Sequence, residues 1–405
     1  MPKIAVIGGG PAGVMCAIQA SKNLENNILI FNKEIILNTI LPTGGGRCNL
    51  AYAEFNFKEL AKNYPRGEKF LYSIFSKFST AETLCFFEKI GIKTYTQDDN
   101  RIFPVTNSSK DVKEALSKEL SRKNIKKLFE KVVKVEKSEV GFKVYTEKSI
   151  YNVDKVVMAT GGKGNGHELV SKLGHKIVPT RPALSSFITK EKNFVGLAGI
   201  SLQNVVVQVF LDNKKIKELK GDFLFTHNGI SGPVIYKTSS YCTYLDFSET
   251  KPLKLCVNLV NDSYENFDNE FLAELKTNSQ KDILNIVSNY VPRNLAIEIL
   301  NILSVKTNIK SGQLTKIDRQ KISKTLTQLT FNVIKISAGE EIVTAGGVDL
   351  KEVDSKTMMS KIIDDLYFCG EILDIDGLTG GFNLQNCWSS AYVVANDVIR
   401  SIIEK

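Results

Sequence analysis

The first thirty residues alternate between short apolar runs and a helical pattern. Residues 3–7 read as a buried strand, residues 14–24 repeat with helical periodicity, and residues 27–31 form a second apolar strand. A glycine-rich turn over residues 8–13 lies between the first strand and the helix. This order predicts the start of a doubly wound parallel sheet, the Rossmann-like core of an α/β domain.

The chain changes character after about residue 185 and changes back near Gly339. Before residue 185, helices are predicted at 57–78, 80–90 and 111–123, the last with Ser109 as its N-cap, and strands at 131–136, 142–146 and 155–159. In the middle section, strands at 204–211, 214–225 and 253–260 precede a helical stretch over about 267–329. A strand at 365–369 and a terminal helix at 389–403 follow.

This alternation predicts two domains with interrupted connectivity. Residues 1–187 and 336–405 are expected to form one cofactor-binding domain from the two ends of the chain. Residues 188–335 are expected to form an inserted, substrate-side domain that is rich in strands first and helical afterwards.

The turn after the first strand fits the GxGxxG fingerprint of dinucleotide binding. Gly8 permits the tight turn, Gly10 lets the backbone approach a pyrophosphate, and Gly13 lets the helix pack on the strand. Pro11 and Ala12 complete the loop, and the helix start supplies N–H donors to the phosphates. The alternative is a glycine-rich turn without a ligand.

An acidic residue normally holds the ribose about 20 residues further on. Here Asn32 occupies that position, followed by Lys33. An amide can still bond a ribose hydroxyl, because it both donates and accepts hydrogen bonds. We therefore predict that Asn32 or a neighbour contacts the adenosine ribose.

A series of further motifs is more specific than the fingerprint. In chain order they read TGGGRCN at 43–49, NRIFP at 100–104, ATGG at 159–162, LFTHNGISGP at 224–233, TAGGV at 344–348, KTMMS at 356–360, GEILDIDG at 370–377 and GGFNLQ at 380–385. Together they resemble the YhiN/BaiN-like bacterial flavoproteins, the family that includes aminoacetone oxidase. The resemblance implies bound FAD and a split FAD domain with an insert. The segment at 163–167 is shorter than this family's loop.

The resemblance and the chemistry of FAD together give a set of predicted cofactor contacts. Beyond the first turn, Asn32 and Lys33, the set comprises Gly44, Gly45, Gly46, Arg47, Cys48, Asn49, Thr160, Gly161, Gly162, Gly370, Glu371, Asp374, Asp376, Gly381, Phe382, Asn383 and Leu384.

Four residues of this set allow more than one interpretation. Arg47 is the expected second partner of the pyrophosphate, since guanidinium suits phosphate oxygens; the alternative is an ordinary ion pair. Cys48 is expected to be a packed thiol, since no partner cysteine is near in sequence for a flavin–disulfide mechanism. Asp374, and less so Asp376, is expected to accept from ribityl hydroxyls, with an N-cap or turn role as the alternative.

The N–H groups around Phe382, Asn383 and Leu384 are expected to face the flavin N1–C2=O edge. Reduced flavin carries negative charge there, so a helix N-terminus would stabilise it. In the insert, His227 and Ser231 are candidate catalytic or substrate-contacting residues, and a structural glycine-rich turn is the alternative. Trp388 is expected to pack in the core.

These observations predict an FAD-dependent oxidoreductase that acts on a small organic substrate by hydride transfer. Oxygen or transiently bound NAD(P)H is the expected redox partner, because no second dinucleotide fingerprint follows a strand. The alternative is a flavin-dependent RNA-modifying protein, motivated by the net charge of +9 and the lysine-rich insert. No aromatic and arginine platform is evident, so nucleic acid is not the expected partner.

The composition excludes several other classes of protein. The seven cysteines lack CxxC spacing and the chain has three histidines, so neither a disulfide framework nor a metal centre is expected. No signal-peptide pattern and no run of about 18 apolar residues occurs, so a cytoplasmic protein without a membrane span is expected. The oligomeric state does not follow from the sequence.

Overall fold

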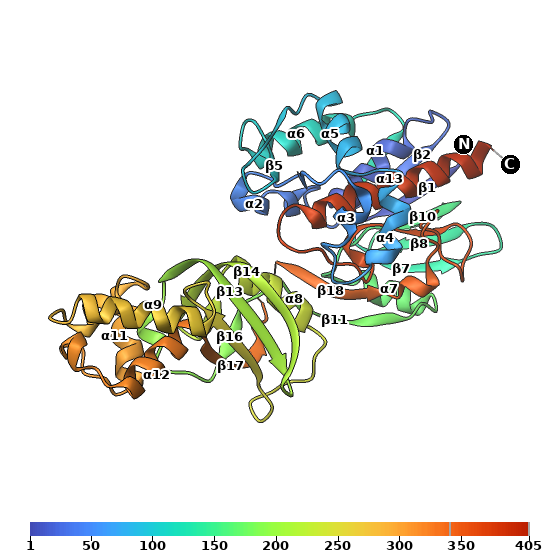
Figure 1. Cartoon of the computed structure of the whole chain (residues 1–405). Helices are drawn as coiled ribbons and strands as arrows, with labels where there is room; N and C mark the ends of the chain where they lie inside the picture. The colour runs from blue at the N-terminus through green and yellow to red at the C-terminus, as the bar shows by residue number, and fades with distance from the viewer. Residues whose placement is uncertain (340–341, 404–405) are drawn as a thin grey trace. The chain divides into compact units, whose positions relative to one another are not determined.

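The structure is a computed structural model that describes residues 1–339 and 342–403 of the 405-residue chain. The chain divides into two compact units: Met1–Arg181 together with Val343–Lys405, and Pro182–Ile342 (Figure 1). Both ends of the chain therefore belong to the first unit. Within the described residues, no helix is both long and apolar enough to cross a membrane.

The first unit is centred on a five-stranded parallel sheet in the order β19-β10-β1-β2-β6. Its strands are β1 (Lys3–Ile7), β2 (Asn27–Phe31), β6 (Ile125–Leu128), β10 (Lys155–Met158) and β19 (Leu366–Phe368). Strand β10 is buried along its whole length, as expected of an inner strand in a parallel sheet covered on both faces. The edge strand β19 is also buried along its whole length. The predicted doubly wound α/β core is confirmed.

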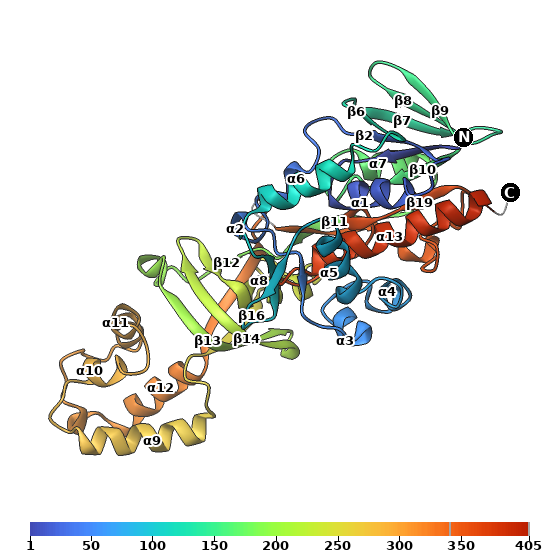
Figure 2. The same cartoon turned by 90° about the horizontal axis from the view of Figure 1, so that it is seen from above.

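Two helices from opposite ends of the chain pack against each other along this sheet. They are α1 (Pro11–Ala20) and α13 (Phe382–Ile403), which run side by side in Figure 2. The predicted terminal helix began at residue 389, so α13 starts seven residues earlier than expected. Consequently only the two glycines of the GGFNLQ motif precede the helix, and its last four residues form the first turn.

The remaining elements of the first unit surround this core. The helices are α2 (Thr43–Gly46), α3 (Phe57–Ala61), α4 (Glu68–Phe75), α5 (Thr80–Lys89), α6 (Ser109–Glu119) and α7 (Gly166–Lys172). Two small antiparallel sheets have the orders β3 (Ala51–Tyr52), β5 (Arg101–Pro104), β4 (Thr94–Thr96), and β7 (Val132–Lys137), β8 (Phe142–Thr146), β9 (Ile150–Val153). Strands β11 (Ile177–Ala183) and β18 (Val343–Val348) pair with each other.

Two local predictions in this unit were wrong. The single helix expected over 57–78 is two helices, α3 and α4, because Gly67 adopts a left-handed conformation (φ +88°) directly before α4. The N-cap of α6 is Ser108 and not Ser109: the Ser108 side chain accepts the backbone N–H of Asp111 at 3.3 Å. Ser109 is the first helical residue, and its hydroxyl donates to the Leu41 carbonyl.

The second unit is a closed six-stranded barrel with a helical insertion. The barrel order is β12 (Phe187–Thr189), β15 (Gly229–Ser231), β14 (Lys214–Thr226), β13 (Ser201–Leu211), β16 (Leu253–Asn258), β17 (Leu329–Ile336). The helices are α8 (Pro233–Cys242), α9 (Tyr264–Thr277), α10 (Ile283–Val287), α11 (Arg293–Ile302) and α12 (Lys316–Thr327). Helices α9 to α12 connect β16 to β17, so the final strand returns after the helices and closes the barrel.

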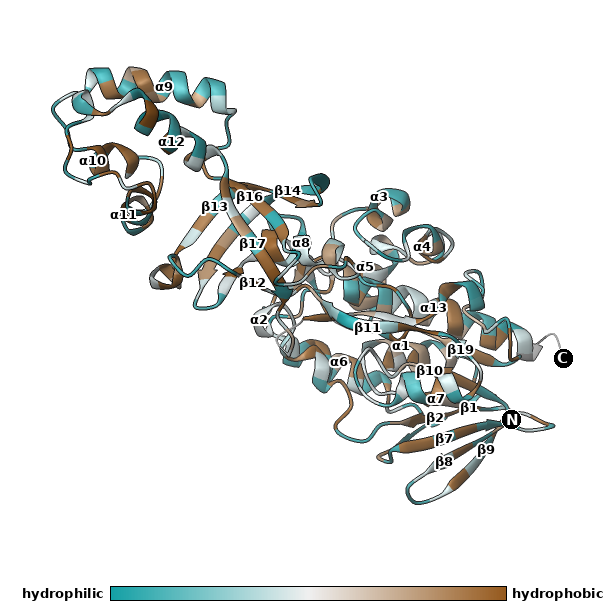
Figure 3. Ribbon diagram, turned by 90° about the horizontal axis from the view of Figure 1, so that it is seen from below, coloured by the Kyte–Doolittle hydropathy of each residue, from teal (hydrophilic) through white to brown (hydrophobic). Residues whose placement is uncertain are grey.

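Apolar side chains fill the interior of the barrel and of the helical insertion. Phe223, Phe225 and Phe331 contact one another inside the barrel. Helix α9 shows alternating hydrophobic and hydrophilic bands in Figure 3, because Phe267 and Phe271 are buried one turn apart. The second unit thus has its own hydrophobic core.

Candidate functional site

The first glycine turn connects β1 to α1, and two of its glycines are packed too closely for any larger side chain. Gly8 has φ +116°, and a Cβ there would lie 2.2 Å from the carbonyl oxygen of Ala159. A Cβ on Gly13 would lie 1.9 Å from the Gly8 carbonyl oxygen. At Gly10 the nearest atom to an added Cβ is the Thr39 hydroxyl, at 3.7 Å. Gly8 and Gly13 therefore serve packing, and Gly10 is the glycine with room for a ligand.

Asn32 lies beside this turn, as predicted for a residue at the end of β2. Its Oδ1 accepts the N–H of Gly9 at 2.9 Å, and its Nδ2 donates to the Glu34 carbonyl at 2.8 Å. Lys33 points to solvent, with Glu34 as its ion-pair partner at 3.7 Å. The structure places Asn32 at the turn, and contacts of Asn32 or Lys33 with a ribose remain predictions.

The second glycine loop has an unusual backbone. Gly44, Gly45 and Gly46 all have positive φ, and an added Cβ at Gly45 or Gly46 would meet no atom within 4 Å. Cys48 is also left-handed (φ +63°) but fully buried, and burial raises the pKa of its thiol to about 12. All seven cysteines are free. Cys48 is therefore a packed thiol, inert as a nucleophile at neutral pH.

Asn49 joins this loop to the start of α13. With its amide oriented to satisfy both groups, its nitrogen donates to the Ala51 carbonyl and its oxygen accepts the N–H of Gly381, each at 3.0 Å. Gly381 has φ +97°, and a Cβ there would lie 2.6 Å from the Ala51 carbonyl oxygen. Segments more than 300 residues apart in the sequence thus share one hydrogen-bonded junction.

Further hydrogen bonds hold the same junction together. The Trp388 indole N–H donates to the Leu50 carbonyl at 3.0 Å, and the Tyr64 hydroxyl donates to the Phe382 carbonyl at 2.6 Å. Trp388 is fully buried, which confirms its predicted core role. Gln385 donates to the Thr83 hydroxyl at 2.8 Å. Each of these bonds joins α13 to the N-terminal part of the first unit.

The loop after β19 carries three acidic residues in different environments. Glu371 accepts the N–H of Thr344 at 2.8 Å, and burial raises its pKa to about 7. Asp376 is fully buried and forms an ion pair with Arg66; burial raises its pKa to about 6 against the opposing effect of Arg66. Asp374 has a buried Oδ1 without a hydrogen-bond partner, and burial raises its pKa as well.

The ATGG segment lies across from this loop. Gly161 has φ +72°, and no atom lies within 4 Å of an added Cβ. A Cβ on Gly162 would lie 2.6 Å from Cβ of Thr344 and 3.1 Å from Oε1 of Glu371. The buried hydroxyl of Thr160 has no hydrogen-bond partner.

The first turn of α13 begins at Phe382. The Asn383 side chain accepts the N–H of Gly377 at 2.8 Å and donates to the Gly377 carbonyl at 2.9 Å. The Asn383 side chain thereby holds the loop that carries the three acidic residues. The backbone N–H of Asn383 lies in the first turn of α13, where N–H groups have no partner within the helix.

These features fit a dinucleotide flavin. The open glycine positions at Gly45, Gly46 and Gly161 provide close backbone approach. The orphaned oxygens of Asp374 and Thr160 are acceptors that a ribityl chain could satisfy. Sequence reasoning missed Arg66, because its partner Asp376 lies 310 residues away. Thr344 was also missed, although it opens the TAGGV motif.

In the second unit, the two catalytic candidates have different environments. His227 is exposed in the turn between β14 and β15, and Ser231 is buried at the end of β15. Their proposed roles remain predictions.

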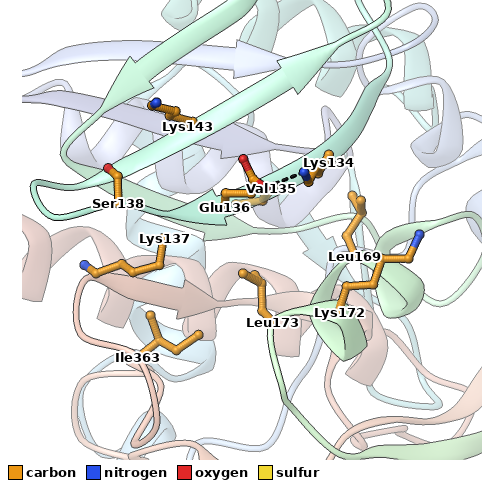
Figure 4. Close-up of a pocket in the computed structure, with 10 residues that line it drawn as sticks. All are labelled: Lys134, Val135, Glu136, Lys137, Ser138, Lys143, Leu169, Lys172, Leu173 and Ile363. Carbon is orange, nitrogen blue, oxygen red and sulfur yellow. Dashed lines mark ion pairs between the residues drawn. The ribbon is translucent and has the colours of Figure 1, made fainter.

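A separate cavity of about 560 Å³ lies in the first unit between β7, β8 and α7 (Figure 4). Lys134, Lys137, Lys143 and Lys172 surround it, and Lys134 forms an ion pair with Glu136. None of the predicted cofactor contacts lines this cavity.

The fold of the whole chain is found among flavoenzymes of known structure. The FrdA subunit of Escherichia coli quinol fumarate reductase superposes with a TM-score of 0.50 at 12% identity, over 98% of this chain and 70% of that chain. The fold and the site define the class of protein: an FAD-dependent oxidoreductase with a Rossmann-type domain.

Within this class, the chain belongs to the family described as HI0933-like protein Rossmann domain, whose family model matches residues 2–397. It is 27% identical to the 3-dehydro-bile acid delta(4,6)-reductase of Clostridium scindens, over 97% of this chain and 98% of that protein. It is 28% identical to the ribosomal RNA dihydrouridine synthase of Escherichia coli, over 97% of both chains. The predicted resemblance to the YhiN/BaiN-like flavoproteins is confirmed.

Proposed function

We propose that this protein reduces a carbon–carbon double bond conjugated to a carbonyl group, with NAD(P)H as the electron donor. The observation that carries the proposal is that two full-length relatives with different substrates share this reaction type. A bile acid with a 3-oxo group and double bonds at positions 4 and 6 is a conjugated dienone. Uridine likewise has a double bond next to a ring carbonyl, and dihydrouridine is its reduced form.

The reaction balances as a two-electron reduction. NAD(P)H gives up one hydride and becomes NAD(P)⁺. The substrate takes up one hydride at the carbon β to the carbonyl and one proton at the α carbon, and the double bond becomes a single bond. When bound, FAD supplies the two-electron transfer between donor and substrate.

The residues of the first unit would divide the work of holding FAD. Gly10, Pro11 and the first turn of α1 would bind the pyrophosphate, and Asp374 with Thr160 would accept from the ribityl hydroxyls. The first-turn N–H groups of α13, at Asn383 and Leu384, would stabilise negative charge on the reduced ring. Asp376 would position the loop, because Arg66 already occupies its carboxylate.

The alternative substrate is a uridine within RNA. The net charge of +9 and the ribosomal RNA dihydrouridine synthases among the relatives support it. A small enone and an RNA uridine undergo the same chemistry, so substrate choice and reaction type are separate questions.

The reaction type is tested without oxygen. NAD(P)H should bleach the flavin band near about 450 nm, and a steroidal 4,6-dien-3-one or an unmodified ribosomal RNA transcript should restore it. Restoration by only one of them identifies the substrate class. A flavin that NAD(P)H reduces but that neither acceptor reoxidises would contradict the proposal.

A further inference from the structure

Two arginines contact one buried aromatic ring beside the second glycine loop. The guanidinium carbon of Arg47 lies 4.2 Å from the ring centroid of Phe103, and that of Arg101 lies 5.6 Å from it. Phe103 is fully buried. The two distances place the two positive charges within roughly 10 Å of each other, where like charges disfavour one another unless an anion lies nearby.

The two arginines differ in how their charge is compensated. Arg101 forms an ion pair with Asp99 at 2.6 Å, and its side chain is 39% exposed. Arg47 has no carboxylate partner in the described part of the chain; its Nε donates to the Gly44 carbonyl at 3.2 Å. The Phe103 ring and this carbonyl hold the Arg47 guanidinium in place. Among the described residues, the positioned charge of Arg47 therefore has no carboxylate to neutralise it.

The cluster of Arg47, Arg101 and Phe103 lies beside the start of α13. Arg101 pairs with Tyr52 across β5 and β3, and the Tyr52 ring lies 4.8 Å from the Phe382 ring. The nearest neighbours of Gly8, Gly9 and Gly10 are Ala159, Asn32, Ile36 and Thr39. Neither Arg47 nor Arg101 is among them, so the observed contacts of the two arginines lie beside the start of α13.

We propose that Arg47, assisted by Arg101, binds an anionic group of the substrate, a carboxylate or a phosphodiester, and does not bind the FAD pyrophosphate. This assignment rests on the proposed function, in which both substrate classes carry such a group. The planar guanidinium suits both anions, and stacking on Phe103 fixes its orientation before the substrate arrives. The expectation that Arg47 contacts the pyrophosphate is replaced by this proposal.

The test uses pairs of probes that differ only in charge. The first pair is a 3-oxo-4,6-diene bile acid and its methyl ester; the second is a short oligouridylate and its uncharged methylphosphonate analogue. Each probe is titrated into the oxidised, FAD-loaded protein, and binding is followed by the change in the flavin absorption spectrum. Arg47→Gln and Arg101→Gln are compared with wild type, with Arg293→Gln in α11 as a matched control on the second unit.

In wild type, the charged member of one pair should bind about 10-fold or more tightly than its neutral partner. Arg47→Gln should retain FAD and bring this ratio close to one, Arg101→Gln should reduce it several-fold, and Arg293→Gln should leave it unchanged. The pair that shows the preference identifies a small carboxylate or RNA as the substrate class.

Three results would overturn the proposal: an unchanged ratio in FAD-loaded Arg47→Gln, loss of FAD from that variant at normal thermal stability, or no charge preference in wild type for either pair. Binding to the oxidised protein needs no turnover. A charge preference that depends on Arg47, found in a protein that reduces neither probe, would thus sustain this inference and refute the proposed function.

Discussion

Asp374 offers the sharpest test of the site, because the same substitution should have opposite effects on the apoprotein and on FAD binding. Its Oδ1 is buried without a hydrogen-bond partner, and burial raises the pKa of the carboxyl. A group that the protein holds in an unfavourable state is expected where a ligand completes the environment. Asp374→Asn keeps the shape of the side chain and removes the charge.

The magnitudes follow from the two environments. Without FAD, Arg66 and the N–H of Gly346 only partly offset the burial of the Asp374 carboxylate. Removing its charge should therefore stabilise the protein by on the order of 1 kcal/mol, which raises Tm by about 2 °C. With FAD, the loss of a charge-assisted hydrogen bond to a ribityl hydroxyl costs about 1.5–3 kcal/mol, or roughly 10- to 150-fold in Kd. Asp376→Asn is the matched control: it disrupts the buried ion pair with Arg66, so it should destabilise both forms by about 3 kcal/mol.

The assay combines thermal unfolding of the apoprotein with an FAD titration followed by flavin fluorescence. The expected pattern is a higher apoprotein Tm and a weaker Kd for Asp374→Asn, and a lower Tm for Asp376→Asn. If Asp374→Asn lowers the apoprotein Tm and leaves the Kd for FAD unchanged, then Asp374 is a structural residue and the assignment fails.

Three further predictions concern the same unit. The pKa of Glu371 in the folded protein is about 7, above its ordinary value of 4.5, so its contribution to apoprotein stability is fully present below about pH 4.5 and is lost as pH rises through 7. Glu371→Gln should therefore flatten the fall in Tm that is measured between about pH 5 and about pH 8. An unaltered slope would contradict this prediction. Leu384→Pro removes an N–H from the first turn of α13 and should lower the flavin reduction potential by about 20 mV relative to Leu384→Ala, measured by a dye-equilibrium titration. Equal potentials in two variants that both retain FAD would show that the N-terminus of α13 does not stabilise the reduced flavin. Asn49→Ala leaves the N–H of Gly381 without its acceptor and should cost about 1–3 kcal/mol in urea unfolding, whereas an unchanged midpoint would show that the junction is not held there.

The sequence predicted four of the five strands of the central sheet, because β1, β2, β10 and β19 are almost entirely buried; it did not predict β6, whose two middle residues are exposed. Continuous apolar runs such as β1 and β10 can be recognised without knowledge of their neighbours. The barrel was not predicted. Strand β12 has three residues, and β17 follows directly after a helical stretch, so neither stands out locally. Barrel closure depends on pairings such as β12 with β17, which join residues about 150 positions apart and leave no local pattern.

The candidate site likewise has a part that the sequence predicted and a part that it did not. Motif spacing identified the glycine turns and the acidic loop, whose backbone requirements are local. It favoured Asp374 over Asp376 only slightly, since the difference between them depends on Arg66 in a distant loop. The Arg47 and Arg101 cluster also escaped notice, because only the fold brings both side chains to Phe103.

The central claim is that the two ends of the chain bind one FAD molecule, and hydrogen–deuterium exchange tests it directly. The apoprotein and the FAD-loaded protein are compared by mass spectrometry over peptides that span residues 5–20, 43–50, 158–163 and 369–387. We predict that FAD slows exchange in the peptides from both ends of the chain, including the first turn of α13. Protection confined to residues 5–20, with the 369–387 peptide unchanged, would contradict the claim.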